Sequence, residues 1–185
     1  MQKLEGNESE RGLIRAAQQG SEEALEQLFR SHWPQAHRAA YLVVRDAAAA
    51  EDIAQESFLA AIRALDRFDR GRPFGPWLHR IVVNRAIDWS RARALRGEVA
   101  QVSGSGSGRP IEEESIPFAE AHFAELESAL GDLSAEHRAV VVLRYLLDYT
   151  PGEIARMLEL PRGTVNSRLR RALDRLAGTL TEGEA

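Results

Sequence analysis

The chain consists of two long segments of helical apolar spacing, separated by one stretch that has no such spacing. Apolar residues recur at intervals of three and four through about residues 21–95 and again through about 118–180, which is the period of an α-helix with one buried face. The run 140–142 could be a strand in isolation, but the spacing on both sides of it favours helix. No segment alternates as a half-buried strand does, so the sequence predicts an all-α fold.

The interruption has the composition of a linker. It contains "VSGSGSGRPIEEESIP", in which Ser, Gly, Pro and acidic residues occur without a periodic apolar set, and such a segment cannot bury a core of its own. A chain of 185 residues is long enough for two small domains. We therefore predict helical domains at 10–96 and 118–180, joined by a flexible acidic Gly/Ser linker at 97–117.

Capping residues mark several helix starts in the first segment. Ser21 and Asp46 precede apolar-periodic stretches, and both residue types cap helix N-termini well. Pro34 is expected to interrupt the first of these helices. The second places Ile53, Phe58 and Ile62 on its inner stripe.

A loop and a further helix complete the first segment. Residues 69–73, "DRGRP", are predicted to be a loop, since they contain Gly and Pro as helix breakers. Pro76 then stands in the first turn of the following helix. Trp77 lies on the apolar stripe of that helix, which favours a role in the core.

The second segment ends in a short helix, a tight turn and a longer basic helix. Ser134 is a predicted cap further upstream, and "TPGE" (150–153) has the pattern of a capping box with Pro at the first helical position. In the last helix, Val165, Leu169 and Leu173 are predicted to anchor one side, leaving polar and basic residues outside. This is the pattern of a helix-turn-helix, whose second helix enters the major groove of DNA.

Positive charge is concentrated in two places, although the net charge of the chain is −4. Residues 61–98 contain nine arginines and four acidic residues, and residues 161–177 contain five arginines and one acidic residue. Residues 112–136, between them, contain eight acidic residues and no basic residue. Two basic patches separated by an acidic stretch favour two contacts with a polyanion.

Other functional classes find little support. The chain has no cysteine, which excludes disulfides and thiolate metal sites. The five histidines are scattered without metal-ligand spacing, and no Gly-rich phosphate loop is present, so we expect no enzymatic activity, cofactor or metal. The polar, acidic N-terminus is unlike a signal peptide, and no apolar run approaches the ~20 residues that span a bilayer. A soluble, cytoplasmic protein without membrane insertion is expected.

Two blocks of sequence resemble a known family. "LSAEHRAVVVLRYLLDYTPGEIARMLELPRGTVNSRLRRALDRL" is similar to region 4 of bacterial RNA polymerase sigma factors of the extracytoplasmic-function (ECF) group of the sigma-70 family. "AEDIAQESFLAAIRALDRFD" and "FGPWLHRIVVNRAIDWSRAR" resemble region 2 of the same group. The blocks occur in the family's order. "TPGEIA" replaces the more usual S.EEIA, and Asn166 stands where many members have a basic residue, so the base preference of the family cannot be transferred.

The resemblance implies a set of contacts. Core polymerase, through the coiled coil of its β′ clamp and through its β flap, would be the protein partner, with the coiled coil binding Asp52, Gln55 and Glu56; a plain solvated face is the alternative for these three. Single-stranded −10 DNA would contact Phe68, Asp69, Arg70, Arg72, Phe74, Asn84, Arg85, Asp88, Arg91 and Arg93. A solvated helix end is the less favoured alternative for Arg91 and Arg93. Duplex −35 DNA would contact Arg162, Thr164, Asn166, Ser167, Arg168, Arg170 and Arg171.

Two hypotheses about function follow. A sigma factor would recognise both promoter elements only when bound to core polymerase, and an anti-sigma factor would sequester it. A stand-alone helix-turn-helix regulator, the alternative, would bind duplex DNA by itself, usually as a dimer on palindromic half-sites. The strand-melting loop and the acidic helix favour the sigma factor, because a repressor needs neither.

Overall fold

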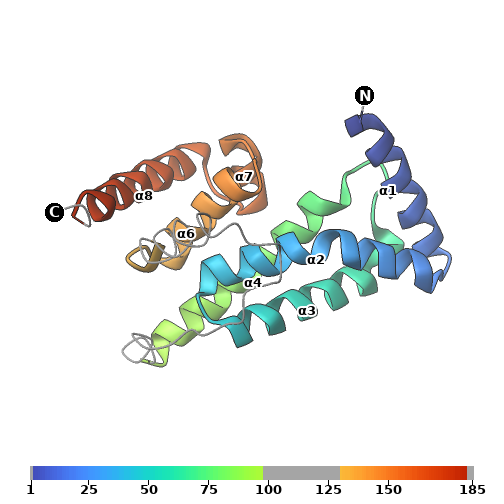
Figure 1. Cartoon of the computed structure of the whole chain (residues 1–185), viewed down its shortest axis with the longest axis horizontal. Helices are drawn as coiled ribbons and strands as arrows, with labels where there is room; N and C mark the ends of the chain where they lie inside the picture. Colours follow the sequence, from blue (N-terminus) through green and yellow to red (C-terminus); the bar gives the residue numbers. More distant parts are fainter. Residues whose placement is uncertain (1, 98–129, 183–185) are drawn as a thin grey trace, which may run out of the picture.

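The computed structural model describes residues 2–97 and 130–182, and its regular elements there are helical throughout (Figure 1). The first group of helices comprises α1 (Gln2–Gln18), α2 (Glu22–Val44), α3 (Ala47–Ala64), a single 3-10 turn η1 (Leu65–Arg67) and α4 (Phe74–Leu95). The second comprises α6 (Ala135–Val141), which continues as the π-helical segment η3 (Val142–Leu146), then α7 (Pro151–Met157) and α8 (Arg162–Glu182). The all-α prediction is confirmed. Most of the predicted linker, and residues 118–129 at the start of the predicted second domain, lie outside the described residues.

The predicted caps are in place. The Ser21 side chain accepts a hydrogen bond from the backbone N–H of Ala24, and Asp46 accepts one from Ala49 at 3.0 Å. Thr150 and Glu153 bond reciprocally as a capping box at the start of α7. Each bond satisfies a donor that the first turn of a helix otherwise leaves without a partner.

The predicted break at Pro34 is wrong, because α2 runs through it from Glu22 to Val44. A proline inside a helix removes one backbone hydrogen bond and costs roughly 3 kcal/mol. Apolar residues are buried on both sides of Pro34, among them Leu28, Ala36 and Val43. Burial of this one continuous face outweighs the local cost of the proline.

The first domain is a bundle in which α2 packs against α1, α3 and α4. Phe58 from α3 and Leu78 and Val82 from α4 are buried in its core. In Figure 1, α3 and α4 run alongside α2, while α1 crosses the end at which α2 begins. The loop between η1 and α4 therefore lies close to α1.

The second domain is smaller, and α6 and α7 both pack against α8. Ile154 and Val165 are fully buried between these helices, and Leu169 is nearly so. Leu173 was predicted to anchor α8, but 42% of it is exposed. Ala172 and Leu176 on either side of it in sequence are buried, so the buried face of α8 continues past Leu173 without including it.

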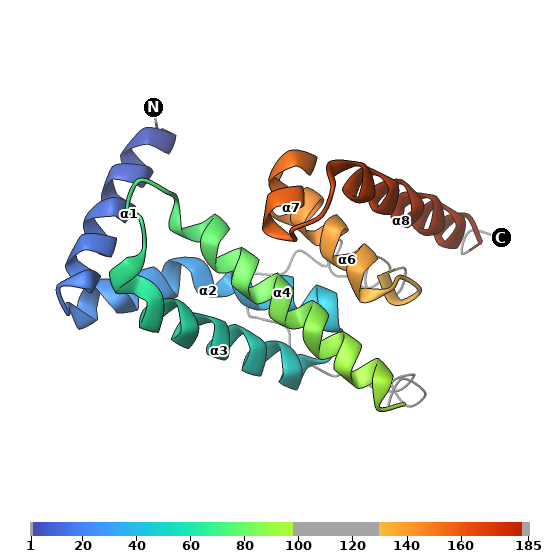
Figure 2. The same ribbon diagram turned by 180° about the vertical axis from the view of Figure 1, so that it is seen from behind.

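The two helical domains pack directly on each other. Helix α6 contacts both α2 and α4, and η3 contacts α2 (Figure 2). The half-buried Arg138 side chain donates hydrogen bonds from its guanidinium to the carbonyls of Val43, at 2.7 Å, and Leu133, at 2.6 Å. His79 Nδ1 lies 2.8 Å from the Tyr149 hydroxyl across the same contact. A single cluster of buried apolar residues therefore extends through both domains.

Candidate nucleic-acid interface

The outer face of α8 is basic and open. Arg162, Asn166, Arg170 and Arg171 are exposed, whereas Thr164, Ser167 and Arg168 are half-buried. Among the side chains that the structure describes, no acidic group forms an ion pair with any of the arginines at 162, 170 and 171. Their charge is therefore available to an external anion.

The turn before α8 orients this face. Glu159 adopts a left-handed conformation with φ 55°, and the Leu160 N–H donates to the Ala155 carbonyl at 2.9 Å. With Val165 buried beneath, the first turn of α8 points away from the domain core. A helix start held in this way can enter a DNA groove without unfolding its support.

Positive potential near α8 also acts on a neighbouring side chain. Burial lowers the pKa of His137, and the charges of Arg168, Arg171 and Arg175 lower it further, while Glu136 opposes them. The three arginines come from α8 and the histidine from α6. This side of the second domain therefore disfavours additional positive charge.

The loop between η1 and α4 presents polar side chains over an aromatic base. Asp69, Arg70 and Arg72 are exposed, and Asp69 Oδ1 accepts from the Gly71 N–H at 2.8 Å. Phe68 and Phe74, which the sequence places among the DNA contacts, are only 8% and 3% exposed. Since these two rings are buried, they can support the loop but cannot stack on a base.

The aromatic base of this loop is a packed cluster. The Phe68 and Trp77 ring centroids are 4.6 Å apart, and Phe74 lies edge-on to both rings. Trp77 is half-buried and packs against the apolar core. These contacts agree with the predicted core role of Trp77.

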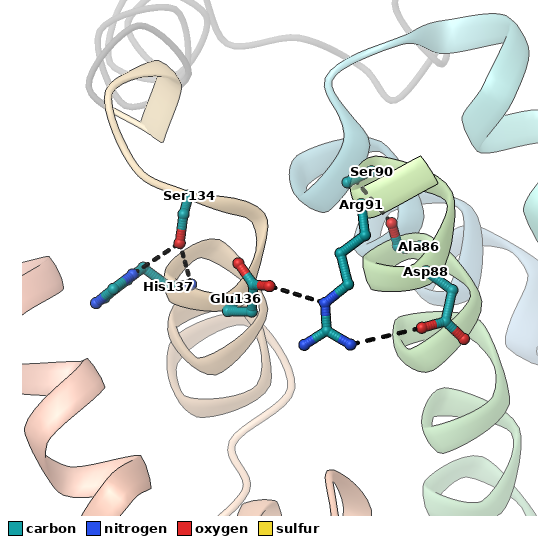
Figure 3. Close-up of polar contacts among 7 residues, drawn as sticks. All are labelled: Ala86, Asp88, Ser90, Arg91, Ser134, Glu136 and His137. Carbon is teal, nitrogen blue, oxygen red and sulfur yellow. Dashed lines mark hydrogen bonds and ion pairs between the residues drawn. The ribbon is translucent and has the colours of Figure 1, made fainter. Parts of the chain in front are cut away.

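Two residues predicted to bind the −10 element make polar contacts with the second domain. Asn84 Nδ2 donates to the Met157 carbonyl at 3.3 Å. Arg91 Nε donates to Glu136 at 2.9 Å, and its Nη1 lies 3.7 Å from Asp88 (Figure 3). In this arrangement, the second domain covers part of the face of α4 to which the −10 contacts were assigned.

Two other arginines of α4 are paired within the first domain. Arg85 forms an ion pair with Glu56 of α3 at 2.8 Å. Arg93 bonds Asp46 at 2.7 Å and lies over the Trp89 ring, 5.0 Å from its centroid. This bond contributes to the lowered pKa of Asp46, for which the larger cause is the backbone N–H of Ala49. Arg85 thus joins a predicted DNA contact to a predicted polymerase contact.

The predicted polymerase contacts Asp52, Gln55 and Glu56 are all exposed on α3. Ile53 and Phe58 are buried beneath them, as expected, but the expectation for Ile62 is wrong because it is 42% exposed. The sequence analysis also missed Leu59, which is 51% exposed. Its spacing from Gln55 and Glu56, at four and three residues, is the signal that could have found it. The acidic face therefore has an apolar margin.

The described residues add two further observations. No group of three or more His, Asp or Glu side chains among them is arranged to hold a metal ion. None of the helices within the described ranges is long and apolar enough to cross a membrane.

Comparison with known families matches both parts of the chain. Residues 28–96 match the model of Sigma-70 region 2, and residues 123–176 match that of Sigma-70, region 4. The two matches stand in the order that the sequence motifs predict. This pairing favours the sigma factor over a stand-alone helix-turn-helix regulator.

Individual proteins are similar over nearly the whole chain. The ECF RNA polymerase sigma factor SigM of Mycobacterium tuberculosis is 35% identical over 172 residues, covering 93% of this chain and 85% of SigM. The RNA polymerase sigma factor CnrH of Cupriavidus metallidurans is 31% identical over 182 residues, covering 94% and 95% of the two chains.

Two solved structures share the fold. CnrH in complex with the cytosolic domain of CnrY aligns with a TM-score of 0.67 at 28% identity, covering 94% of this chain and 97% of CnrH. The sigma factor RpoE of Bartonella quintana, in complex with the anti-sigma factor NepR, aligns with a TM-score of 0.67 at 25% identity, covering 84% and 96%. On the matches to both regions and to these relatives, the chain belongs to the ECF group of the sigma-70 family of RNA polymerase sigma factors.

Proposed function

We propose that this sigma factor directs promoter-specific initiation by holding the −35 element on α8 and the −10 element on the loop before α4 while bound to core polymerase. The observation that carries the proposal is the outer face of α8, where exposed arginines without acidic partners follow a capped helix and a tight turn. The chain then acts as an initiation factor without catalytic chemistry of its own, in the cytoplasm where RNA polymerase works.

For the −35 element, α8 supplies the contacts. Arginine can bond guanine O6 and N7 together, and asparagine can bond adenine in the same bidentate way. Arg170, Arg171 and Asn166 are the candidates for base edges because they are exposed on the groove-facing side. The remaining members of the set are assigned to phosphate and sugar: Arg162, Thr164, Ser167 and Arg168.

For the −10 element, the exposed loop side chains and α4 supply the contacts. Asp69, Arg70 and Arg72 are open to an unstacked base and its backbone. The proposed −10 contacts continue along α4 with Asn84, Arg85, Asp88, Arg91 and Arg93. We assign Phe68 and Phe74 a supporting role, because burial keeps their rings from the strand.

For core polymerase, the outer face of α3 supplies the contacts. Asp52, Gln55 and Glu56 provide acidic and hydrogen-bonding groups, and Leu59 and Ile62 add apolar area beside them. A charged face with an apolar margin suits a protein better than DNA, whose phosphates would repel the carboxylates. The β′ clamp coiled coil is the proposed partner here, and the β flap is the proposed partner of the second domain.

On the promoter the two domains have to separate. Elements named for positions −10 and −35 lie about 25 base pairs apart, or about 85 Å of duplex at 3.4 Å per pair. A compact chain of this length has a radius of gyration of only about 16 Å. We therefore treat 10–96 and 118–180 as units that move apart while the linker at 97–117 keeps them connected.

An anti-sigma factor is the proposed regulator. CnrH and RpoE, which share this fold, have structures in complex with the cytosolic domain of CnrY and with the anti-sigma factor NepR. A partner that holds the two domains together would keep Asn84 and Arg91 bonded to the second domain. It would thereby prevent the −10 contacts while leaving the catalytic activity of polymerase unchanged.

Run-off transcription with purified core polymerase on a randomised promoter library tests the proposal. Adding the full chain is expected to yield initiation at a discrete set of promoters that share two elements. Glu56→Arg is expected to abolish this by preventing core binding, with Glu26→Arg on α2 as the matched control. Promoter-independent transcription, or duplex binding by the chain alone on palindromic sites, would contradict the proposal.

A further inference from the structure

Helix α1 precedes the region that matches the family model, which begins at residue 28. It nevertheless makes polar contacts with both ends of the loop before α4. These contacts come from two side chains, Glu10 and Gln18, which are eight residues apart on α1. At the helical rise this spacing is about 12 Å.

The first contact holds the end at which α3 and η1 stop. Gln18 Nε2 donates to the Leu65 carbonyl at 2.9 Å and to the Phe68 carbonyl at 3.2 Å. The Leu65 carbonyl also accepts the Phe68 N–H at 2.9 Å, whereas the Phe68 carbonyl lies beyond η1, where a side chain from elsewhere can satisfy it. Gln18 is half-buried, which limits the access of water to these bonds.

The second contact holds the end at which α4 starts. Glu10 Oε2 accepts a hydrogen bond from the Phe74 N–H at 3.4 Å, and Glu10 Oε1 lies 2.9 Å from His32 Nε2. The residue at the N-cap of α4 is Pro73, which makes no side-chain cap. Glu10 therefore supplies from α1 the acceptor that the local sequence lacks.

His32 completes this second anchor. The His32 ring centroid lies 5.2 Å from that of Phe74. A Cβ added at Gly75 would come within 3.4 Å of the His32 ring. The bond from His32 is also the main cause that lowers the pKa of Glu10, which keeps the carboxylate ionised as an acceptor. One helix thus fixes both sides of a loop whose side chains are otherwise exposed.

We propose that α1 sets the conformation of loop 69–73 for reading the −10 element, with Gln18 and Glu10 as its positioning residues. The inference rests on the proposed function, in which that loop contacts the unstacked strand. A site that reads a base has to be held to within about 0.5 Å, and an unanchored loop loses conformational entropy on binding. Anchoring both ends removes part of that cost before DNA arrives.

Substitution of Gln18 tests the first anchor in the full chain with core polymerase. Gln18→Ala removes both bonds, and Gln18→Glu keeps the shape but replaces the amide donor with a carboxylate facing two carbonyls. Gln19→Ala, at an exposed neighbour, is the control. The readout is the ratio of open complex on a consensus −10 element to that on a substituted one. Both Gln18 variants are expected to lower this ratio about fivefold, as the loss of a hydrogen bond of ordinary strength predicts.

The same assay separates positioning from general support of the fold. The ratio for consensus over substituted −35 elements is expected to remain at the wild-type value in both variants, as is core binding. For the second anchor, Glu10→Ala is expected to lower the −10 ratio, and Glu10→Gln, which keeps an acceptor for Phe74, to restore most of it. Wild-type −10 ratios in all Gln18 and Glu10 variants, or equal losses at −10 and −35, would overturn the inference.

Amide hydrogen exchange distinguishes failure of this inference from failure of the proposed function. Gln18→Ala is expected to accelerate exchange at Gly71 and Arg72 at least fivefold, while amides inside α2 and α3 keep wild-type rates. Faster exchange in the loop is expected even if the wild-type chain supports no −10-dependent initiation. Absence of such initiation would overturn the proposed function and leave the anchoring role of α1 intact. Unchanged exchange in the loop overturns the inference whatever the transcription assay shows.

Discussion

Helices α4 and α8 are both arginine-rich, but their arginines are in different environments. Four arginines of α4 are paired with carboxylates from α3, the turn before α8, the start of α6 or the turn before α3: Arg80 with Glu159, Arg85 with Glu56, Arg91 with Glu136 and Arg93 with Asp46. On α8, the arginines at 162, 170 and 171 have no acidic partner among the described side chains. The residue type is the same in both helices, and the neighbouring side chains decide whether each arginine is paired with a carboxylate.

The difference separates two ways of meeting DNA. A phosphate can approach α8 without displacing any protein group, whereas a phosphate that binds Arg91 has to displace Glu136. The partly exposed pairs of Arg80 and Arg91 with the second domain contribute at most about 1 kcal/mol each, so these two can be exchanged once another force separates the domains. Helix α8 therefore presents uncompensated positive charge, whereas the arginines of α4 are compensated by carboxylates from other parts of the chain.

Acidification is expected to have the largest effect, because it lowers the stability of the fold through a buried histidine of α4. His79 of α4 is 4% exposed, and burial, aided by the charge of His32, lowers its pKa from 6.5 to about 4. The unfolded chain takes up a proton near pH 6.5 and the folded chain only near pH 4, so the free energy of unfolding falls as pH is lowered through that window. The loss from His79 is about 3 kcal/mol, and urea unfolding across the window measures it.

His79→Gln isolates this contribution, because other groups titrate over part of the same range. Glu10, Asp46 and Glu136 have lowered pKa values and lose their share of stability at the acid end. Burial raises the pKa of Tyr149, so its hydroxyl stays protonated throughout. The variant is expected to show a shallower slope than the wild type between pH 6.5 and about 4. An identical slope would exclude His79 as the source.

Removing the open charge of α8 is expected to have the next largest effect. Arg170→Ala combined with Arg171→Ala removes two proposed base contacts, each worth roughly 1–3 kcal/mol. Together the two contacts are worth at least about 2 kcal/mol, so initiation at −35-dependent promoters is expected to fall at least about thirtyfold in run-off transcription. Arg30→Ala, an exposed arginine on α2, is the control. If core binding is lost together with initiation, these arginines serve the fold or the polymerase instead of DNA.

Weakening the contact between the two domains tests whether it is this contact that keeps the arginines of α4 paired. Arg138→Met removes the donor to the Val43 and Leu133 carbonyls, and a buried carbonyl left without a donor costs about 2 kcal/mol. Since the chain has no cysteine, dyes attached at Gln35→Cys and Asp174→Cys report the separation of the domains. Lower energy transfer and a lower free energy of unfolding are expected; Arg156→Met is the control. Unchanged energy transfer would mean that other contacts hold the domains together.

The smallest expected effect concerns the support of α8. Thr150→Ala removes the capping-box oxygen at the start of α7 and is expected to destabilise the second domain by about 1 kcal/mol. Thr150→Ser, which keeps an oxygen in reach, is expected to retain most of this stability. Hydrogen exchange in α7 and α8 measures both variants. Equal changes in α2 would contradict a local role for the cap.

Features set by nearby residues could be predicted from the sequence. Ser21, Asp46 and Thr150 cap their helices as expected, because the partner of each is only three residues away. The outward direction of Asn166 and Arg170 follows from the helical period together with Val165 and Leu169 on the opposite side. The roles of these outward residues remain predictions.

Features set by distant residues could not be predicted. Arg138 bonds a carbonyl 95 positions away, and no local pattern in "AEHRAVV" announces that contact. Pro34 is tolerated because α2 packs against four other helices, and Ile62 is exposed because none of the described helices covers its side of α3. Asn84 and Arg91 have the right character for DNA contacts, but their neighbours in the structure come from beyond the linker.

The continuity of α2 through Pro34 also has a mechanical consequence. The helix has 23 residues and is therefore about 34 Å long, held by Glu10 at His32 and by Arg138 at Val43. Its missing backbone bond lies between these two supports, and a helix bends most readily where a proline removes such a bond. We therefore expect strain applied by the second domain at Val43 to be taken up by bending at Pro34, before it reaches the end of α2 that lies near the loop.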